Sequence, residues 1–175
     1  MKSRVDWSAD VHQAMRAAGI AQVAYVPDSG LADIIRKCAS DEDMRTISLT
    51  TEQEGVGLTC GAWLGGQRAA LLMQSSGVGN CINALSMVKA CGFPFLAIVT
   101  MRGMWGEFNP WQVPMGQASA ATLQLANVIV HQVDRAEDVG ETVAAGAHLA
   151  FDSSVGVAVL ISQRIIGAKA FMVSK

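Results

Sequence analysis

The stretch Thr51-Glu52-Gln53-Glu54-Gly55 joins a predicted strand at residues 45–49 to a predicted glycine- and alanine-rich helix that runs to about residue 64. An acidic side chain therefore stands where a strand ends and a helix begins. Open α/β sheets bind ligands at the carboxyl ends of their strands, so this is a favourable place for a functional acid. Helix capping is the alternative, because Thr51 and Glu54 have the spacing of a capping box. Capping accounts for Glu54 and leaves Glu52 as the candidate functional residue.

Strands and helices are predicted to alternate on both sides of this stretch. The expected strands are residues 21–26, 46–49, 69–73, 95–100, 127–130 and 155–161. The segments 69–73 and 95–100 are almost wholly apolar, which is typical of strands buried on both faces of a parallel sheet. Alternation of this kind predicts an α/β fold, a doubly wound parallel sheet with helices on both faces, in one domain over residues 1–175.

Local signals predict where several of the connecting segments begin and end. Ser8 is expected to cap a first helix that ends at Gly19. Residues 74–80 are expected to form a turn, in which Gly77-Val78-Gly79 offers backbone N–H groups to an anion, before a helix that ends near residue 92. Residues 101–119 are expected to form a long functional loop, followed by a short helix from residue 120.

Composition limits the classes of function. Hydrophobic residues make up 51% of the 175 residues and charged residues 16%, which is below the usual quarter, so apolar surface is expected to remain for a partner. A net charge of -2 argues against nucleic-acid binding. Neither a secretory signal nor a membrane-spanning run is evident, and the four cysteines lack metal-ligand spacing. We therefore expect a cytoplasmic protein with buried thiols and no membrane contact.

Common nucleotide and hydrolase motifs are missing from the sequence. It contains neither the phosphate-loop motif G-x-x-x-x-G-K-[ST] nor the complete dinucleotide motif G-x-G-x-x-G. The nucleophile elbow G-x-S-x-G is also absent.

Several motifs together resemble one enzyme family. They are Glu52-Gln53-Glu54-Gly55-Val56-Gly57, Gly61-Ala62-Trp63-Leu64, and Met73-Gln74-Ser75-Ser76-Gly77-Val78-Gly79-Asn80 followed by Asn83-Ala84-Leu85. In this order they resemble the pyrimidine-binding domain of thiamine-diphosphate-dependent 2-oxoacid decarboxylases, which has a flavodoxin-like architecture. Val26-Pro27-Asp28-Ser29, Gln112-Val113-Pro114-Met115-Gly116 and the closing run from Ser162 to Ala168 are similar to the sulfopyruvate and phosphonopyruvate decarboxylase branch, and most similar to sulfopyruvate decarboxylase alpha subunits.

The resemblance implies a role for Glu52 and a set of cofactor contacts. In the family, the acid at this position hydrogen-bonds a ring nitrogen of the aminopyrimidine, which helps the cofactor lose its thiazolium proton; the cofactor itself carries the difficult chemistry. Gln74, Ser75, Gly77 and Asn80 are expected to line the pyrimidine pocket. For Ser75 and Asn80 the alternative is capping of the next helix.

The substrate is expected to be a small anionic 2-oxoacid. Arg102 follows a predicted strand and is the candidate for binding a sulfonate or phosphonate; the alternative is a solvated loop arginine. Asp28 and Ser29 follow the first strand and are candidates for substrate contact or proton relay; the alternative is an Asx turn that supports Gly30. Gln112 is expected to reach the site from the long loop.

The resemblance also implies a partner, because the Gly-Asp-Gly motif that binds Mg²⁺ and diphosphate in relatives is absent. A beta subunit is therefore expected to hold Mg²⁺ and the diphosphate, with no metal site on this chain, in a hetero-oligomer with at least two copies of each chain. The implied reaction converts 3-sulfopyruvate to sulfoacetaldehyde and carbon dioxide. A subunit for phosphonopyruvate or another acidic 2-oxoacid, and a non-catalytic subunit of the same fold, remain alternatives.

Overall fold

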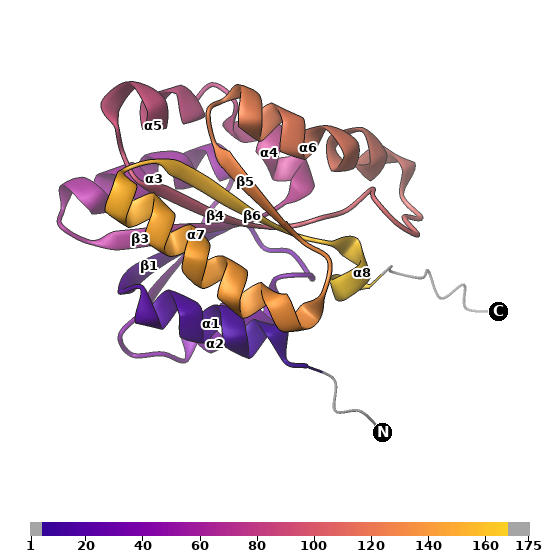
Figure 1. The fold of residues 1–175 in the computed structure, drawn as a ribbon, viewed down its shortest axis with the longest axis horizontal. Helices are drawn as coiled ribbons and strands as arrows, with labels where there is room; N and C mark the ends of the chain where they lie inside the picture. The colour runs from indigo at the N-terminus through magenta and orange to yellow at the C-terminus, as the bar shows by residue number, and fades with distance from the viewer. Residues whose placement is uncertain (1–4, 168–175) are drawn as a thin grey trace.

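The computed structural model describes residues 5–167, which form a six-stranded parallel sheet covered by helices on both faces (Figure 1). The strand order is β2-β1-β3-β4-β6-β5. The strands are β1 (Ile20–Tyr25), β2 (Arg45–Ser48), β3 (Arg68–Gln74), β4 (Phe95–Thr100), β5 (Ile129–Val133) and β6 (Gly156–Ile161). The predicted doubly wound parallel sheet is confirmed.

Two helical layers enclose the sheet, each with its own hydrophobic core. The first layer is α1 (Trp7–Ala17), α2 (Ala32–Ala39) and α7 (Val139–Ser153); the second is α3 (Glu52–Leu64), α4 (Ser75–Cys81), α5 (Leu85–Cys91) and α6 (Val113–Leu125). Met15, Ile34 and Phe151 belong to the core under the first layer. Every residue of β4 and β6 is buried, as expected for central strands of a parallel sheet.

The sheet has a topological switch point between β1 and β3, where the direction in which successive strands are added reverses. The chain leaves β1 for β2 on one side and then crosses back to β3 on the other. From β4 the chain crosses to β5 at the far side of the sheet and then returns to β6. Ligands bind outside the carboxyl ends of strands at topological switch points. The short helix α8 (Gln163–Ile166) and the segment that leads into α6 lie near the carboxyl ends of the strands (Figure 1).

The first helix begins earlier than predicted. Its N-cap is Asp6, whose side chain accepts a hydrogen bond from the backbone N–H of Ala9. Ser8 lies inside α1 and donates its hydroxyl to Asp6, so the prediction that Ser8 is the cap was wrong. The predicted end was correct, because Gly19 follows the helix at φ +70°, a conformation that glycine adopts at low cost.

The segment after β3 differs from the predicted turn. Helix α4 begins at Ser75, directly after the last strand residue, and a break at residues 82–84 separates it from α5. Gly77 and Gly79 therefore lie within a helix and do not form a strand-to-helix turn. The glycines serve close packing instead, since a Cβ on Gly77 would overlap the carboxyl group of Glu52.

The predicted loop over residues 101–119 was half correct. Residues 101–109 are irregular, but the 3₁₀ helix η1 (Pro110–Gln112) leads directly into α6 at Val113. The irregular segment and α6 approach each other closely at two glycines. A Cβ on Gly103 would lie 2.3 Å from the carbonyl oxygen of Gln112, and a Cβ on Gly116 would lie 2.0 Å from the carbonyl oxygen of Arg102.

The expectation of four buried thiols was wrong for one cysteine. Cys38, Cys60 and Cys81 are buried, whereas Cys91 at the end of α5 is exposed. Burial raises the pKa of the Cys81 thiol to about 12, with a smaller contribution from the nearby Glu52 carboxylate. Among the helices of residues 5–167, none combines the length and the apolar character needed to cross a bilayer.

Candidate functional site

Glu52 is the first residue of α3 and lies at the carboxyl edge of the sheet. Its side chain is largely buried, with the whole residue 7% exposed. Asn80 Nδ2 donates a hydrogen bond of 2.8 Å to Glu52 Oε2. Oε1 accepts no hydrogen bond from any of the described residues. The carboxyl group is thus held by one oxygen and keeps the other for a further partner.

Gly77 allows this carboxyl group to lie against α4. A Cβ built at Gly77 would be 2.4 Å from both Cδ and Oε1 of Glu52. Real Cβ atoms do not approach other atoms so closely, so any larger residue would push the carboxyl group away. The two predicted residues Gly77 and Asn80 therefore both contact Glu52, from the same helix.

Glu54 has the local role that the sequence predicted, with a different partner. Its carboxylate accepts the backbone N–H of Thr50 at 3.0 Å and the Thr50 hydroxyl at 3.0 Å, while the Thr51 side chain makes no capping bond. The reciprocal capping box is therefore not formed. These bonds, led by the Thr50 N–H, lower the pKa of Glu54 below its ordinary value.

Asp28 lies where three neighbouring strands end. Its carboxylate accepts hydrogen bonds from Gln74 Nε2 at 2.7 Å, from the Gly30 N–H at 2.9 Å and from Thr100 Oγ1 at 3.2 Å. The bond to Gly30 is the predicted Asx-type contact. The other two bonds tie Asp28 to the ends of β3 and β4, so Asp28 is fixed by more than its own turn.

Three of the four predicted substrate residues line one small cavity of about 190 Å³. Its lining residues are Asp28, Ser29, Gly30, Arg102, Ile166 and Gly167. The cavity brings together residues that follow β1, β4 and β6. Gln112, the fourth predicted residue, does not line it.

Arg102 is buried at 5% exposure, so the alternative of a solvated loop arginine was wrong. Its guanidinium donates two hydrogen bonds to Glu107, from Nε to Oε2 at 2.8 Å and from Nη2 to Oε1 at 2.6 Å. The guanidinium also lies over the ring of Phe108, 5.7 Å from its centroid. The hydrogen bond from Arg102, with further ones from Asn109, Gly103 and Gln163, lowers the pKa of Glu107 to about 2.

Ser75 joins α4 to the segment that carries Arg102. It is fully buried, and its hydroxyl accepts the backbone N–H of Arg102 at 3.0 Å. Its backbone carbonyl accepts a hydrogen bond from Ser119 at 3.1 Å. The hydroxyl thus holds the start of the segment that carries Arg102. The predicted cofactor contact of Ser75 stays a prediction.

Gln112 lies in η1 and is half-buried. Its Oε1 is buried and has no hydrogen-bond partner within residues 5–167. A buried acceptor without a donor is costly, so this atom is a place where a bound group would gain a hydrogen bond. Its predicted substrate contact stays a prediction.

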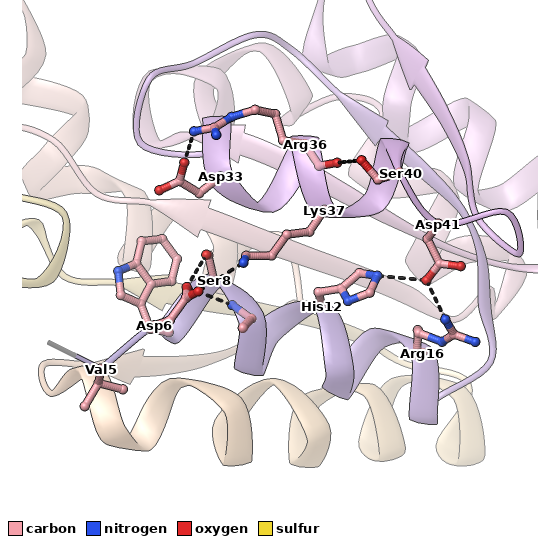
Figure 2. Close-up of a pocket in the computed structure, with 12 residues that line it drawn as sticks. Val5, Asp6, Ser8, His12, Arg16, Asp33, Arg36, Lys37, Ser40 and Asp41 are labelled. Atoms are coloured by element: carbon pink, nitrogen blue, oxygen red, sulfur yellow. Dashed lines mark hydrogen bonds and ion pairs between the residues drawn. The ribbon is translucent and has the colours of Figure 1, made fainter. Parts of the chain in front are cut away.

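A wide groove of about 1020 Å³ lies elsewhere, between α1 and α2 (Figure 2). The basic side chains along it are paired with acids: Lys37 with Asp6, Arg36 with Asp33, and Arg16 and His12 with Asp41. None of the predicted site residues lines this groove.

Sequence reasoning missed two residues at the carboxyl edge. Glu107 neutralises Arg102, and Gln163, which is fully buried, bonds both to Glu107 and to the backbone N–H groups of Met104 and Trp105. Gln163 belongs to the closing motif that carried part of the family resemblance, and that was the available signal. Among the described residues, no group of three or more His, Cys, Asp or Glu side chains is arranged to hold a metal ion.

Comparison with solved structures supports the fold. The chain superposes on a 2-oxoglutarate:ferredoxin oxidoreductase from Magnetococcus marinus with a TM-score of 0.77 and 15% identity, covering 91% of this chain and 29% of that one. At this identity the likeness concerns the fold alone.

Sequence relatives are more informative. The sulfopyruvate decarboxylase subunit alpha of Methanococcus maripaludis is 34% identical over 86% of this chain and 91% of its own length. That of Methanothermobacter thermautotrophicus is 33% identical over 90% of this chain and 96% of its own length. The phosphonopyruvate decarboxylase of Streptomyces viridochromogenes is 34% identical over 69% of this chain but only 31% of its own length.

Residues 6–108 match the family described as thiamine pyrophosphate enzyme, N-terminal TPP binding domain. This range contains Asp28, Glu52, Gln74, Gly77 and Asn80, the residues that the fold gathers at the carboxyl ends of β1, β2 and β3. The parallel sheet, the position of Glu52 and the sequence relatives all point to the same family. The chain belongs to the thiamine pyrophosphate enzymes and corresponds to their N-terminal TPP-binding domain.

Proposed function

We propose that the chain is the alpha subunit of a two-chain thiamine-diphosphate-dependent 2-oxoacid decarboxylase that converts 3-sulfopyruvate to sulfoacetaldehyde and carbon dioxide. The observation that carries the proposal is the Glu52 carboxyl group, buried at the carboxyl edge of the sheet, bonded to Asn80 through Oε2 and with Oε1 left without a donor among the described residues.

The site fits the aminopyrimidine ring of the cofactor on two grounds. Gly77 leaves room for Glu52 by having no Cβ, so the acid is held in place without being covered by a side chain of α4. A carboxyl oxygen without a protein partner suits a ring nitrogen that shares a proton with it. When bound, the cofactor supplies the electron sink for decarboxylation.

The chain's own residues would position the cofactor ring and the substrate and hold protons. Glu52 would hold the proton of the ring nitrogen through Oε1, and Asn80 would keep Glu52 in that orientation. Gln74 would orient Asp28, which faces the cavity shared with Ser29 and Arg102 and is placed to hold a proton or contact the substrate.

A partner chain is proposed on two observations. Relatives named as alpha subunits are matched over almost their whole length, whereas phosphonopyruvate decarboxylase is matched over less than a third of its length. Several large apolar side chains are also exposed, among them Trp111 at 86%, Leu125 at 85% and Leu64 at 75%. We propose that a beta subunit covers such surface and holds Mg²⁺ and the diphosphate group, in a cytoplasmic hetero-oligomer.

Phosphonopyruvate is the second candidate substrate. It is favoured by the two phosphonopyruvate decarboxylases among the relatives, which are 34% and 35% identical to the matched parts of this chain. The substrate differs from 3-sulfopyruvate only in the terminal anionic group.

The proposal is tested by co-expressing the chain with a partner that carries the Gly-Asp-Gly motif and assaying decarboxylation with thiamine diphosphate and Mg²⁺. We expect release of carbon dioxide and sulfoacetaldehyde from 3-sulfopyruvate by the two chains together and not by either alone. Robust turnover by this chain alone would contradict the two-chain arrangement. Turnover of phosphonopyruvate but not of 3-sulfopyruvate would select the second candidate.

A further inference from the structure

Arg102, which forms an ion pair with Glu107, lines the same cavity as Asp28. Arg102 is 7% and Glu107 3% exposed in their side chains, and the pair is bidentate. Arginine and carboxylate in this fork geometry form one of the stronger ion pairs in proteins. The positive charge of the Arg102 guanidinium is therefore already balanced by the Glu107 carboxylate.

Glu107 is fixed and cannot turn away to free the arginine at low cost. Its two oxygens accept five hydrogen bonds: two from Arg102, one each from the N–H groups of Gly103 and Asn109, and one from Gln163 Nε2. Gln163 is itself held, because its Oε1 accepts the N–H groups of Met104 and Trp105 at 3.0 Å each. Breaking this set would leave several buried donors without partners.

The charge at the cavity follows from these contacts. Arg102 is the only cation among the described residues that line it, and Asp28 contributes a carboxylate of its own. Because Glu107 is paired with Arg102, one cation stands against two acids. Nη1 of Arg102 donates no hydrogen bond to any of the described residues, so the guanidinium still offers N–H donors without offering a net positive charge.

We propose that Glu107 determines the charge specificity of this site: by neutralising Arg102 while leaving the N–H groups of Nη1 available, it makes the cavity accept a singly charged sulfonate in preference to a doubly charged phosphonate. The inference rests on the proposed decarboxylase function and assigns a specificity-determining role to a residue that makes no contact with the reacting atoms. Gln163 is the positioning residue that holds Glu107.

The physical reason is the charge that each group brings. A sulfonate carries one negative charge at all physiological pH values, whereas a phosphonate, like a phosphate ester, loses a second proton near neutral pH. The second charge gains nothing from a neutralised guanidinium and is repelled by Glu107 and Asp28. At separations of several ångströms in a partly buried site, one charge is worth about tenfold or more in binding.

The test compares Glu107→Gln with wild type, both assembled with the beta subunit, using 3-sulfopyruvate and phosphonopyruvate as substrates. We expect the ratio of kcat/KM for 3-sulfopyruvate to that for phosphonopyruvate to fall about tenfold, chiefly through a lower KM for phosphonopyruvate. Glu141→Gln on α7 is the matched control, because it removes the same charge in the other helical layer and should leave the ratio unchanged. An unchanged or higher ratio in Glu107→Gln overturns the inference.

A second measurement on the wild-type complex applies even if Glu107→Gln does not fold. Inhibition by 3-phosphonopropionate and by 3-sulfopropionate is measured at about pH 6 and about pH 8, on either side of the second phosphonate ionisation. We expect the phosphonate to inhibit several-fold less well at the higher pH relative to the sulfonate. Equal or better relative inhibition at the higher pH overturns the inference, while absence of turnover in the wild-type complex with either substrate would instead contradict the proposed function.

Discussion

Asn80 donates a 2.8 Å hydrogen bond to Oε2 of Glu52 and so links α4 to the first residue of α3. The two residues are 28 positions apart, and they meet because β2 and β3 deliver both helices to the same edge of the sheet. The bond fixes one carboxyl oxygen and thereby the direction of the other. Asn80 is therefore a residue that orients the proposed functional acid.

Replacing Glu52 by Gln is expected to lower kcat of the assembled enzyme by about 10²-fold to 10⁴-fold, the usual range for a general acid–base group, because the amide cannot share a proton with the cofactor ring. The shape is nearly unchanged, so folding should be retained. Steady-state kinetics and the urea midpoint measure the two effects. Glu54→Gln is the control, since it alters an acid of the same helix turn whose carboxylate bonds to the neighbouring Thr50. Near-normal turnover in Glu52→Gln refutes the assignment.

Replacing Gly77 by Ala should disturb the same acid indirectly. The new methyl group would lie 2.4 Å from Glu52 Cδ, so the carboxyl group must move. We expect a loss of turnover of at least tenfold, with binding of thiamine diphosphate weakened in isothermal titration. If Gly77→Ala keeps wild-type turnover, the close packing of Glu52 against α4 does not matter for catalysis.

Gly57 and Gly61 lie on an open side of α3, where an added Cβ meets no atom within 4 Å. Alanine is the better helix former, so each Gly→Ala substitution is expected to stabilise the chain by about 0.5–1 kcal/mol. Urea unfolding measures the change. A loss of stability in either variant would show that these positions are more constrained than their surroundings indicate.

Acid should weaken the segment that carries Arg102. The pKa of Glu107 is held at about 2, below its ordinary value of 4.5, chiefly by its hydrogen bonds with Arg102. A depressed carboxyl pKa gives stability that is complete above the ordinary value and is lost as the pH falls from 4.5 towards 2. In urea unfolding across that range, wild type should therefore lose stability more steeply than Glu107→Gln; parallel curves would argue against the ion pair.

Trp111 is proposed as an interface residue because 86% of its surface is exposed. Exposed tryptophans often dominate binding energy at protein interfaces, so Trp111→Ser should weaken assembly with the beta subunit about tenfold or more. Analytical ultracentrifugation of the mixed chains measures this. The urea midpoint of the chain alone should not change, and His148→Ala, an exposed ring in the other helical layer, should leave assembly intact.

Much of the fold could be predicted because its signals are local. The predicted strand at residues 95–100 agrees with the structure at both ends, and the predicted helix that holds Glu52 ends at Leu64 as expected. The starts of α4 and α6 could not be predicted in this way. Gly77 was expected in a turn and Gly116 in a long loop, but each is needed where a helix packs closely against a distant carboxyl or carbonyl group.

Local signals predicted only part of the candidate site. Glu52 and Asp28 follow strands, and the parallel order of the sheet brings such positions to one edge. Where a side chain points depends on contacts that the sequence does not reveal. Ser75 turned out to bond to the backbone of Arg102, and Arg102 turned out to be paired with Glu107.

Short segments of the chain were enough to predict the alternation of apolar strands and helices, the parallel sheet, and an acid after the second strand, because periodicity and strand ends are local properties. The folded chain was needed to show that Asn80 and Gly77 lie against Glu52, that Glu107 neutralises Arg102 and that Gln163 holds Glu107. Those relationships join residues that are brought together by strand order and close packing, and their energies exist only once the chain has folded.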